Sequence, residues 1–195
     1  MWRQIAPAFR ITLLMTILTG LLYPALVTGV CQILFRGQAN GSLAVVDHRV
    51  VGSTLIGQGF TRPEYLHPRP SAAGNGYDGL ASGGSNLGPT SEKLIARVKA
   101  DAGKFHQQNP GVTGLLPADL LTASGSGLDP DVSPASAAVQ VARIAQARGI
   151  APEHIREVIA EHTIGRTLGF MGEPRVNVLE VNLDLDRLFP FKAAR

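Results

Sequence analysis

The stretch ITLLMTILTGLLYPALVTGVCQILF (residues 11–35) contains no charged residue, and Arg10 and Arg36 bound it. A helix rises about 1.5 Å per residue, so this segment is long enough to cross a hydrocarbon layer of about 30 Å with some tilt. A cleaved signal peptide would have a shorter apolar core and a small-residue cleavage site. A buried core helix is seldom apolar on every side over this length. The stretch therefore predicts a retained, single-pass membrane anchor.

The anchor divides the chain into three parts. Residues 1–10 form a short N-terminal segment, residues 11–35 the transmembrane helix, and residues 36–195 one soluble domain. A chain segment of this last length is sufficient for a single domain with its own hydrophobic core. We expect the domain to work beside membrane lipid.

The orientation is predicted from the charges that flank the anchor. Arg3 and Arg10 precede it together with the free amine, whereas Arg36 and Arg49 follow it. Because positively charged flanks tend to stay in the cytoplasm, the balance favours a cytoplasmic N-terminus. The large domain is then expected outside, at the cell (inner) membrane.

The composition excludes some classes of function. The whole chain has a formal net charge of only +3, and its Lys and Arg residues are not clustered with aromatic residues. A nucleic-acid partner is therefore not expected. The single cysteine, Cys31, lies inside the anchor, so the domain cannot contain an internal disulfide.

Small residues recur along the anchor at a spacing of four. Helices associate within membranes by close backbone approach at small residues, so this pattern indicates a partner-facing side. A chance pattern is the alternative, because Gly and Thr are common in anchors. Pro24 lies mid-span and predicts a kink, since proline removes a backbone hydrogen bond. The predicted partner-facing residues are Thr12, Thr16, Gly20, Ala25 and Gly29.

The soluble part has the pattern of a mixed α+β domain. A long Gly- and Pro-rich segment, Thr61–Pro89, has little charge and is expected to be an ordered, partner-facing loop. In the second of three predicted helices, Ser136, Gln140 and Arg143 are expected on the exposed face. The predicted elements are strands at 43–46, 50–51 and 53–56, helices at 91–108, 134–148 and 152–165, and a half-buried strand at 179–185.

Two glycine-rich motifs invite a nucleotide interpretation. Residues 74–79 match G-x-G-x-x-G, but the dinucleotide fingerprint requires a preceding strand and a following helix, so we interpret the motif as a turn. Backbone amides and hydroxyls in a second run could form an anion-binding nest, but an ordered turn is the better interpretation. The weak candidates for cofactor binding are Ser82, Gly83, Gly84, Ser85 and Asn86.

The residues indicate neither a catalytic centre nor a metal site. Ser124 and Ser126 lack the G-x-S-x-G context, and no histidine is marked as their base. A membrane-anchored extracytoplasmic serine hydrolase remains the alternative function. His154, Glu157 and Glu161 share one helix face, which we interpret as solvated polar surface rather than as metal ligands.

Eight runs of residues, in order along the chain, together resemble one family, the C subunit of the bacterial Kdp potassium-transporting P-type ATPase. The runs are GLLYP (20–24), QANGSL (38–43), GSTLIGQGF (52–60), RPSA (69–72), SGGSNLGP (82–89), DLLTASGSGLDP (119–130), VQVARIAQARG (139–149) and GEPRVNVL (172–179).

The resemblance implies a non-catalytic accessory subunit of a high-affinity, ATP-driven potassium import complex. Its implied partners are a channel-like potassium-binding subunit and a P-type ATPase subunit. The family is also described as a catalytic chaperone that raises the ATP affinity of the pump subunit. No cofactor is assigned to this chain, and ATP would act through the pump subunit. An outward domain would have to influence that site by coupling through the anchor and the partner subunits. We expect the loops Thr61–Pro89 and Thr122–Pro134 to contact the channel-like subunit.

Overall fold

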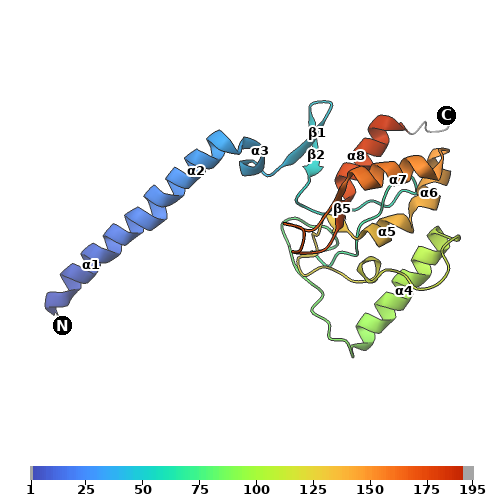
Figure 1. Cartoon of the computed structure of the whole chain (residues 1–195). Helices are drawn as coiled ribbons and strands as arrows, with labels where there is room; N and C mark the ends of the chain where they lie inside the picture. Colours follow the sequence, from blue (N-terminus) through green and yellow to red (C-terminus); the bar gives the residue numbers. More distant parts are fainter. Residues whose placement is uncertain (1, 191–195) are drawn as a thin grey trace. The chain divides into compact units, whose positions relative to one another are not determined.

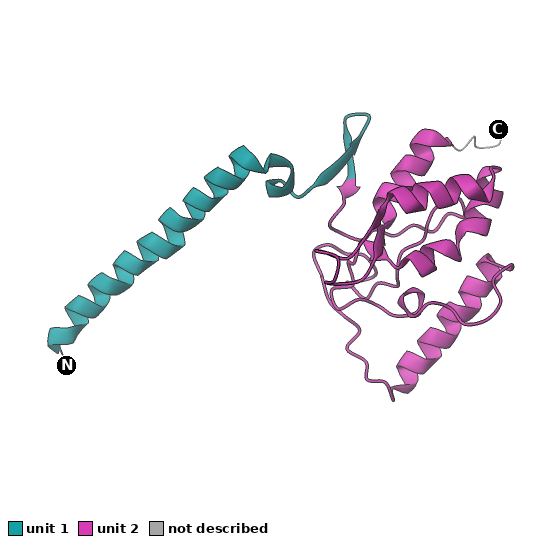
Figure 2. Cartoon of the chain, viewed as in Figure 1, with its two compact units in different colours: residues 1–51 teal, residues 52–195 magenta. Residues whose placement is uncertain are grey.

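A computed structural model describes residues 2–190, and Figure 1 labels its helices and strands. The chain forms two compact units, Met1–Val51 and Gly52–Arg195 (Figure 2). Each unit is considered by itself below.

The first unit begins with the predicted anchor. Among residues 2–190, one helix, Trp2–Leu34, is long and apolar enough to cross a membrane, and none of its most apolar part is buried within the protein. This confirms the helix that the uncharged stretch predicts. Its parts are α1 (Trp2–Ile17), a π-helical turn η1 (Leu18–Leu22) and α2 (Tyr23–Leu34).

The π-helical turn shows how the anchor accommodates its proline. The Tyr23 N–H donates to Leu18 O, five residues earlier, and Pro24 occupies the first turn of α2. At that position the missing N–H costs little, because it lies beside the wider turn. The helix continues past Pro24 without a sharp bend in Figure 1, so a change of register replaces the predicted kink.

A short helix and a hairpin follow the anchor. They are α3 (Arg36–Ala39), β1 (Leu43–Val46) and β2 (Arg49–Ser53), and the two strands pair with each other. Asp47 and His48 form the two-residue turn with φ values of 48° and 63°, as the favoured hairpin turns require. The predicted strand at 53–56 is wrong beyond Ser53, because the chain turns there and Thr54 O accepts a hydrogen bond from Asn177 Nδ2 at 2.9 Å.

The second unit contains a small antiparallel sheet. Strands β3 (Asp131–Val132), β5 (Arg175–Asn177) and β4 (Thr163–Ile164) lie in the order β3-β5-β4 within the described residues. Buried Val132 and Val176 face each other in its register. These side chains join the hydrophobic core that the surrounding helices complete.

The helices of the second unit begin and end at recognisable capping residues. Ser91 and Ser133 accept N-terminal backbone N–H groups, and Gly149 ends a helix with φ of +67°. The elements are α4 (Glu92–Gln108), the 3-10 turn η2 (Ala118–Leu120), α5 (Pro134–Ala138), α6 (Val141–Arg148), α7 (Pro152–Glu161) and α8 (Val178–Leu188).

The predicted strand at 179–185 is wrong, because these residues belong to α8. Leucine and valine do alternate there, but the buried Val178, Val181 and Leu185 recur at the helical spacing of three and four. Asn177 caps this helix by accepting the Glu180 N–H at 3.1 Å. An N-cap with a glutamate three residues later is a helix-start signal, and it outweighs the alternation.

Two further helix predictions needed correction. The predicted helix at 134–148 is divided into α5 and α6, and the one at 152–165 ends at Glu161. The face predicted as exposed is also wrong, because Ser136, Gln140 and Arg143 are all buried. The prediction from periodicity placed the alanines of this segment on the buried face. The three polar side chains can be buried because they have hydrogen-bond partners inside the domain.

We expect Asn177→Ala to lower the free energy of unfolding by about 1–2 kcal/mol, since it removes both the cap of α8 and the hydrogen bond to Thr54 O. Urea unfolding of the purified chain would measure this loss. The matched variant Ser91→Ala removes one cap bond from α4 and should cost less. Equal losses for the two variants would contradict the role given to Asn177.

Candidate functional site

Arg143 of α6 holds the first part of the Thr61–Pro89 loop. Its side chain is only 8% exposed and donates to Pro63 O at 2.5 Å and to Tyr65 O at 3.0 Å. The same guanidinium donates to Asn109 Oδ1 at 3.0 Å and to Gln140 Oε1 at 2.7 Å. A buried charge is tolerated only when its donors are satisfied, so this set of acceptors explains its burial.

Two buried amide side chains hydrogen-bond to the backbone of this loop. Each bonds both the N–H and the C=O of one loop residue, as the backbone of a neighbouring strand would. Gln140 accepts the His67 N–H at 2.9 Å and donates to His67 O at 3.1 Å. Asn182 of α8 accepts the Leu66 N–H at 2.7 Å and donates to Leu66 O at 2.9 Å. Leu66 is fully buried in the core between these contacts. The loop therefore has a defined course, as the sequence predicts. We call Arg143, Gln140 and Asn182 the clasp.

Burial at the clasp affects the protonation of Arg143 and of the neighbouring His67. Burial lowers the pKa of Arg143 to about 10, with Glu64 opposing the shift, so the guanidinium stays charged at neutral pH. Burial, and then the charge of Arg143, lower the pKa of His67 to about 4. His67 is therefore neutral, and its Nε2 lies 2.9 Å from Arg62 O.

The clasped loop and α4 enclose a cavity of about 300 Å³. Its lining is mixed: three aromatic side chains contribute to it, and Lys104 and Asp101 of α4 supply opposite charges. Tyr77 donates to Arg69 O at 2.5 Å, and burial raises the pKa of its hydroxyl to about 12, so it stays protonated. Sequence analysis missed this cavity, because its lining comes from separate parts of the chain, including Phe60, His67, Pro70 and Phe105.

The two glycine-rich loops lie against each other. The Gly83 N–H donates to Ser126 O at 2.8 Å, and the Ser82 hydroxyl donates to the same oxygen at 3.0 Å. A Cβ at Gly84 would lie 3.0 Å from Gly125 O, so this close contact favours glycine. Within the weak candidate for an anion nest, residues 82–86, the Gly83 amide is thus already bonded to protein.

The G-x-G-x-x-G motif has the structure of a turn, as predicted. Residues 74–79 contain neither helix nor strand. The Gly76 N–H and the Asp78 N–H both donate to Ala73 O, and Gly74 and Gly76 have positive φ. The strand-to-helix context of a dinucleotide site is absent from this segment.

The candidate nucleophiles have local partners. Ser124 Oγ lies 3.3 Å from Ser126 Oγ, and Ser126 Oγ accepts the Leu128 N–H at 3.1 Å. Throughout residues 2–190, neither hydroxyl is hydrogen-bonded to a histidine. The general base that a serine hydrolase requires is therefore missing from this arrangement.

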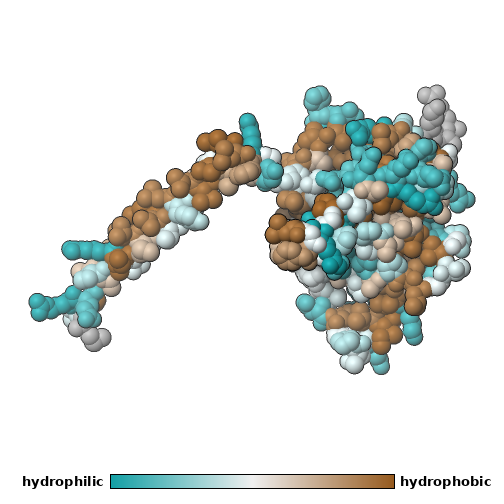
Figure 3. All heavy atoms as spheres, viewed as in Figure 1, coloured by the Kyte–Doolittle hydropathy of each residue, from teal (hydrophilic) through white to brown (hydrophobic). Residues whose placement is uncertain are grey.

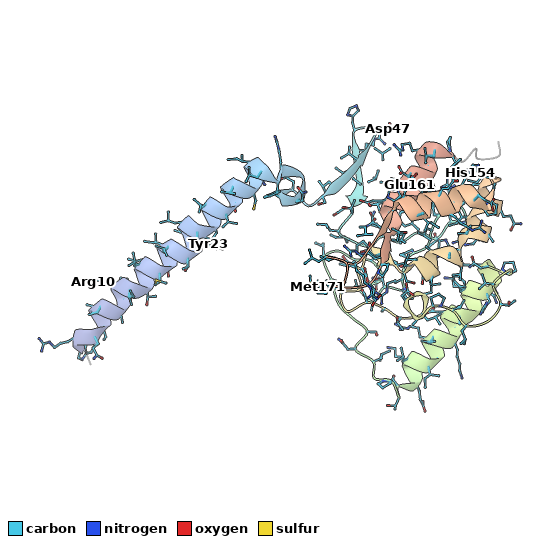
Figure 4. All side chains as sticks on the ribbon, viewed as in Figure 1. Arg10, Tyr23, Asp47, His154, Glu161 and Met171 are labelled. Atoms are coloured by element: carbon cyan, nitrogen blue, oxygen red, sulfur yellow. The ribbon has the colours of Figure 1, made fainter. Side chains whose placement is uncertain are left out.

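The polar face of α7 does not gather into a metal site. His154 contacts Glu157 at 3.4 Å, whereas Figure 4 shows His154 and Glu161 near opposite ends of the helix. In the described part of the chain, no group of three potential ligands is suited to hold a metal ion.

The anchor residues selected from the sequence are exposed along the helix. A Cβ added to Gly20 would lie 3.9 Å from Thr16 Cγ2, so these two residues are neighbours on one side. Gly29 has open space around its Cα. The π-helical turn separates Thr12 and Thr16 from Ala25 and Gly29 and changes the helix register between the two groups.

The low pKa of His67 predicts a pH dependence of stability. An unfolded chain protonates this histidine near its ordinary pKa of 6.5, whereas the folded chain resists protonation to about pH 4. The free energy of unfolding should therefore fall as the pH drops from 6.5 to 4, and the His67 contribution should level off below that.

His67→Gln should flatten this dependence in urea unfolding experiments at pH 7, 5.5 and 4.5. The control His154→Gln removes an exposed histidine and should leave the pH dependence in place. An unchanged slope in His67→Gln would contradict the assignment.

Comparison with known proteins covers almost the whole chain. Residues 5–187 match the model of the family described as "K+-transporting ATPase, c chain". A relative from Gemmatimonas aurantiaca is 57% identical over 189 residues, which cover 96% of this chain and 94% of the relative. One from Myxococcus xanthus is 55% identical, with 97% and 90% covered. One from Koribacter versatilis is 49% identical over the full length of both chains.

All three relatives carry the name "Potassium-transporting ATPase KdpC subunit". The identities are far above the level at which a shared family could be doubted, and the match includes both the anchor and the domain. The chain therefore belongs to the KdpC family, the c chains of potassium-transporting ATPases.

Proposed function

We propose that this chain is the non-catalytic accessory and assembly subunit of an ATP-driven potassium import complex. The observation that carries the proposal is the family match over residues 5–187, which spans the anchor and the domain together. The local hydrogen bonding of Ser124 and Ser126 supports it as well, because these serines have no base beside them in the described chain.

The proposed partners are a channel-like potassium-binding subunit and a P-type pump subunit. Within the membrane, Thr12, Thr16 and Gly20 would pack against a partner helix, with Ala25 and Gly29 serving the second half of the anchor. Their exposure along α1 and α2 is compatible with close helix packing, which in lipid depends on small residues.

The proposed topology has residues 1–10 in the cytoplasm, residues 11–35 in the membrane and residues 36–195 outside. The supporting observation is the position of Arg3 and Arg10 before the uncharged stretch 11–35. With this topology the domain never meets cytoplasmic ATP. Any rise in the ATP affinity of the pump subunit would be a coupling free energy transmitted by the anchor and the partner subunits.

The two glycine-rich loops are the proposed contact surface on the domain. Thr61–Pro89 is held in shape by the clasp, and its second half lies against Thr122–Pro134 through Gly83 and Ser126. Pre-organised loops lose little conformational entropy on binding, so they suit a permanent contact between subunits.

Single cysteines at Ser85 and Ser126, each in a Cys31→Ser background, should react with a membrane-impermeant thiol reagent in intact cells. Gel shift of the labelled chain measures this. A denatured sample gives the maximum labelling and controls for burial. Labelling only after lysis would place the domain inside and would support direct contact with ATP instead.

Ser85→Arg should reduce co-purification of the chain with an affinity-tagged pump subunit, because it places a charged side chain on the proposed loop surface. Potassium uptake at low external potassium should fall in parallel. Gln107→Arg adds the same charge on the exposed side of α4 and serves as the control. Normal assembly and uptake with Ser85→Arg would count against this loop as a contact.

A further inference from the structure

The connection between β4 and β5 contains a tight, hydrogen-bonded turn. Thr167 and Met171 exchange backbone hydrogen bonds of 2.8 and 2.9 Å, and the Gly169 N–H donates to Arg166 O at 3.0 Å. These bonds leave a three-residue loop, Leu168–Phe170, at the tip. We call residues 167–171 the apolar turn.

Large apolar side chains of this turn lie in solvent. Leu168 is 78% exposed, Phe170 71% and Met171 45%, and Ile164 of the adjoining β4 is 45% exposed. Figure 4 places Met171 at the edge of the second unit, where Figure 3 shows hydrophobic atoms gathered. Together these side chains present on the order of 400 Å² of apolar area, within the range of the largest patch on a typical monomer.

The backbone of the turn is also strained at a leucine. Leu168 has a φ of +54°, which lies in the left-handed region, and Gly169 follows with +82°. A side chain in this region costs free energy that glycine would avoid. Leu168 recovers little of this cost by packing inside the chain, because most of it is exposed. Backbone strain of this kind clusters at functional sites such as ligand clamps and switch regions.

The charges beside the apolar turn are paired within the protein. Arg166 donates to both oxygens of Glu173, at 2.9 and 2.7 Å, and Arg175 lies 3.1 Å from Asp131. Surfaces that bind anionic lipid keep Lys or Arg available for phosphate headgroups. Here both arginines are already paired with carboxylates of the same chain. The surface around the turn is therefore complementary to an uncharged, apolar partner surface.

The area of the apolar turn also limits which partner could bind to it. A standard interface buries about 800 Å² on each partner, roughly twice what the apolar turn presents. Two copies of this chain joined only through it would therefore dissociate readily. The patch suits an occupant that other contacts already hold nearby, as they do between subunits of one membrane complex.

We propose that the apolar turn inserts Leu168 and Phe170 into an uncharged, apolar recess on another subunit of the potassium-transporting ATPase. The proposal rests on the proposed function, because that function supplies the partner. The turn then acts as a preformed anchor on the domain, separate from the glycine-rich loops Thr61–Pro89 and Thr122–Pro134. Its rigid shape limits the entropy lost on docking.

The test uses Leu168→Gly and Phe170→Ser in the complete complex, with co-purification on a tagged pump subunit as the readout. Each variant should lower the recovered chain at least about fivefold, the change that a loss of about 1 kcal/mol produces. Leu168→Gly removes the backbone strain, so its thermal unfolding temperature should be unchanged or higher. Weaker assembly without lower stability separates docking from a folding defect.

Leu115→Ser is the matched control, since Leu115 is a fully exposed leucine that lies outside the apolar turn. It should leave recovery at the wild-type level. Full recovery of both turn variants, while the wild-type chain co-purifies, overturns the inference alone. Failure of the wild-type chain to co-purify overturns the proposed function.

A fluorescent probe on Phe170→Cys, in a Cys31→Ser background, distinguishes the occupant. The emission should shift to the blue in vesicles only when the other subunits are present. Quenching by brominated lipid in vesicles that contain this chain alone would show a bilayer as the occupant and overturn the proposal. Disulfide cross-linking between two copies of the same variant without the probe, whose thiol is free, would overturn it in favour of self-association.

Discussion

The second unit depends on one buried charge, the guanidinium of Arg143. The loop that it holds runs through the protein without a strand or helix, so its carbonyl groups need donors from elsewhere. Arg143 supplies them at Pro63 and Tyr65 and is itself oriented by Asn109 and Gln140. Because Leu66 is buried beside these contacts, the polar clasp and the hydrophobic core form together. Loss of the guanidinium would leave several buried acceptors unsatisfied at once.

Two kinds of exposed surface stand out on the second unit. The glycine-rich loops use their amides and hydroxyls on each other, as Gly83 and Ser126 do. The apolar turn differs from these polar loops, because its large apolar side chains are exposed to solvent. Membership of a family of ATPase subunits is consistent with both surfaces. A subunit of a complex can have surfaces that are exposed in the isolated chain and covered by its partners.

Local signals in the sequence were sufficient for elements whose stability is local. The uncharged run predicted the apolar N-terminal helix, and the residue patterns predicted a strand at 43–46 and a helix at 91–108, which are β1 and α4. The segment at 178–188 was mistaken for a strand because leucine and valine alternate there. The capping pair Asn177 and Glu180 was the signal that could have corrected it. The cavity beside α4 had no such signal, since its lining side chains are far apart in sequence.

The sequence by itself determined the long apolar N-terminal helix, the α+β class and the family, because each rests on composition, short-range spacing or the order of motifs. Only the tertiary structure decided that Gln140 and Arg143 lie inside and that Leu168 and Phe170 lie outside. The physical reason is that polar burial depends on partners distant in the chain. A polar residue is stable inside when acceptors such as Pro63 O reach it, and an apolar residue remains outside when no part of its own chain covers it.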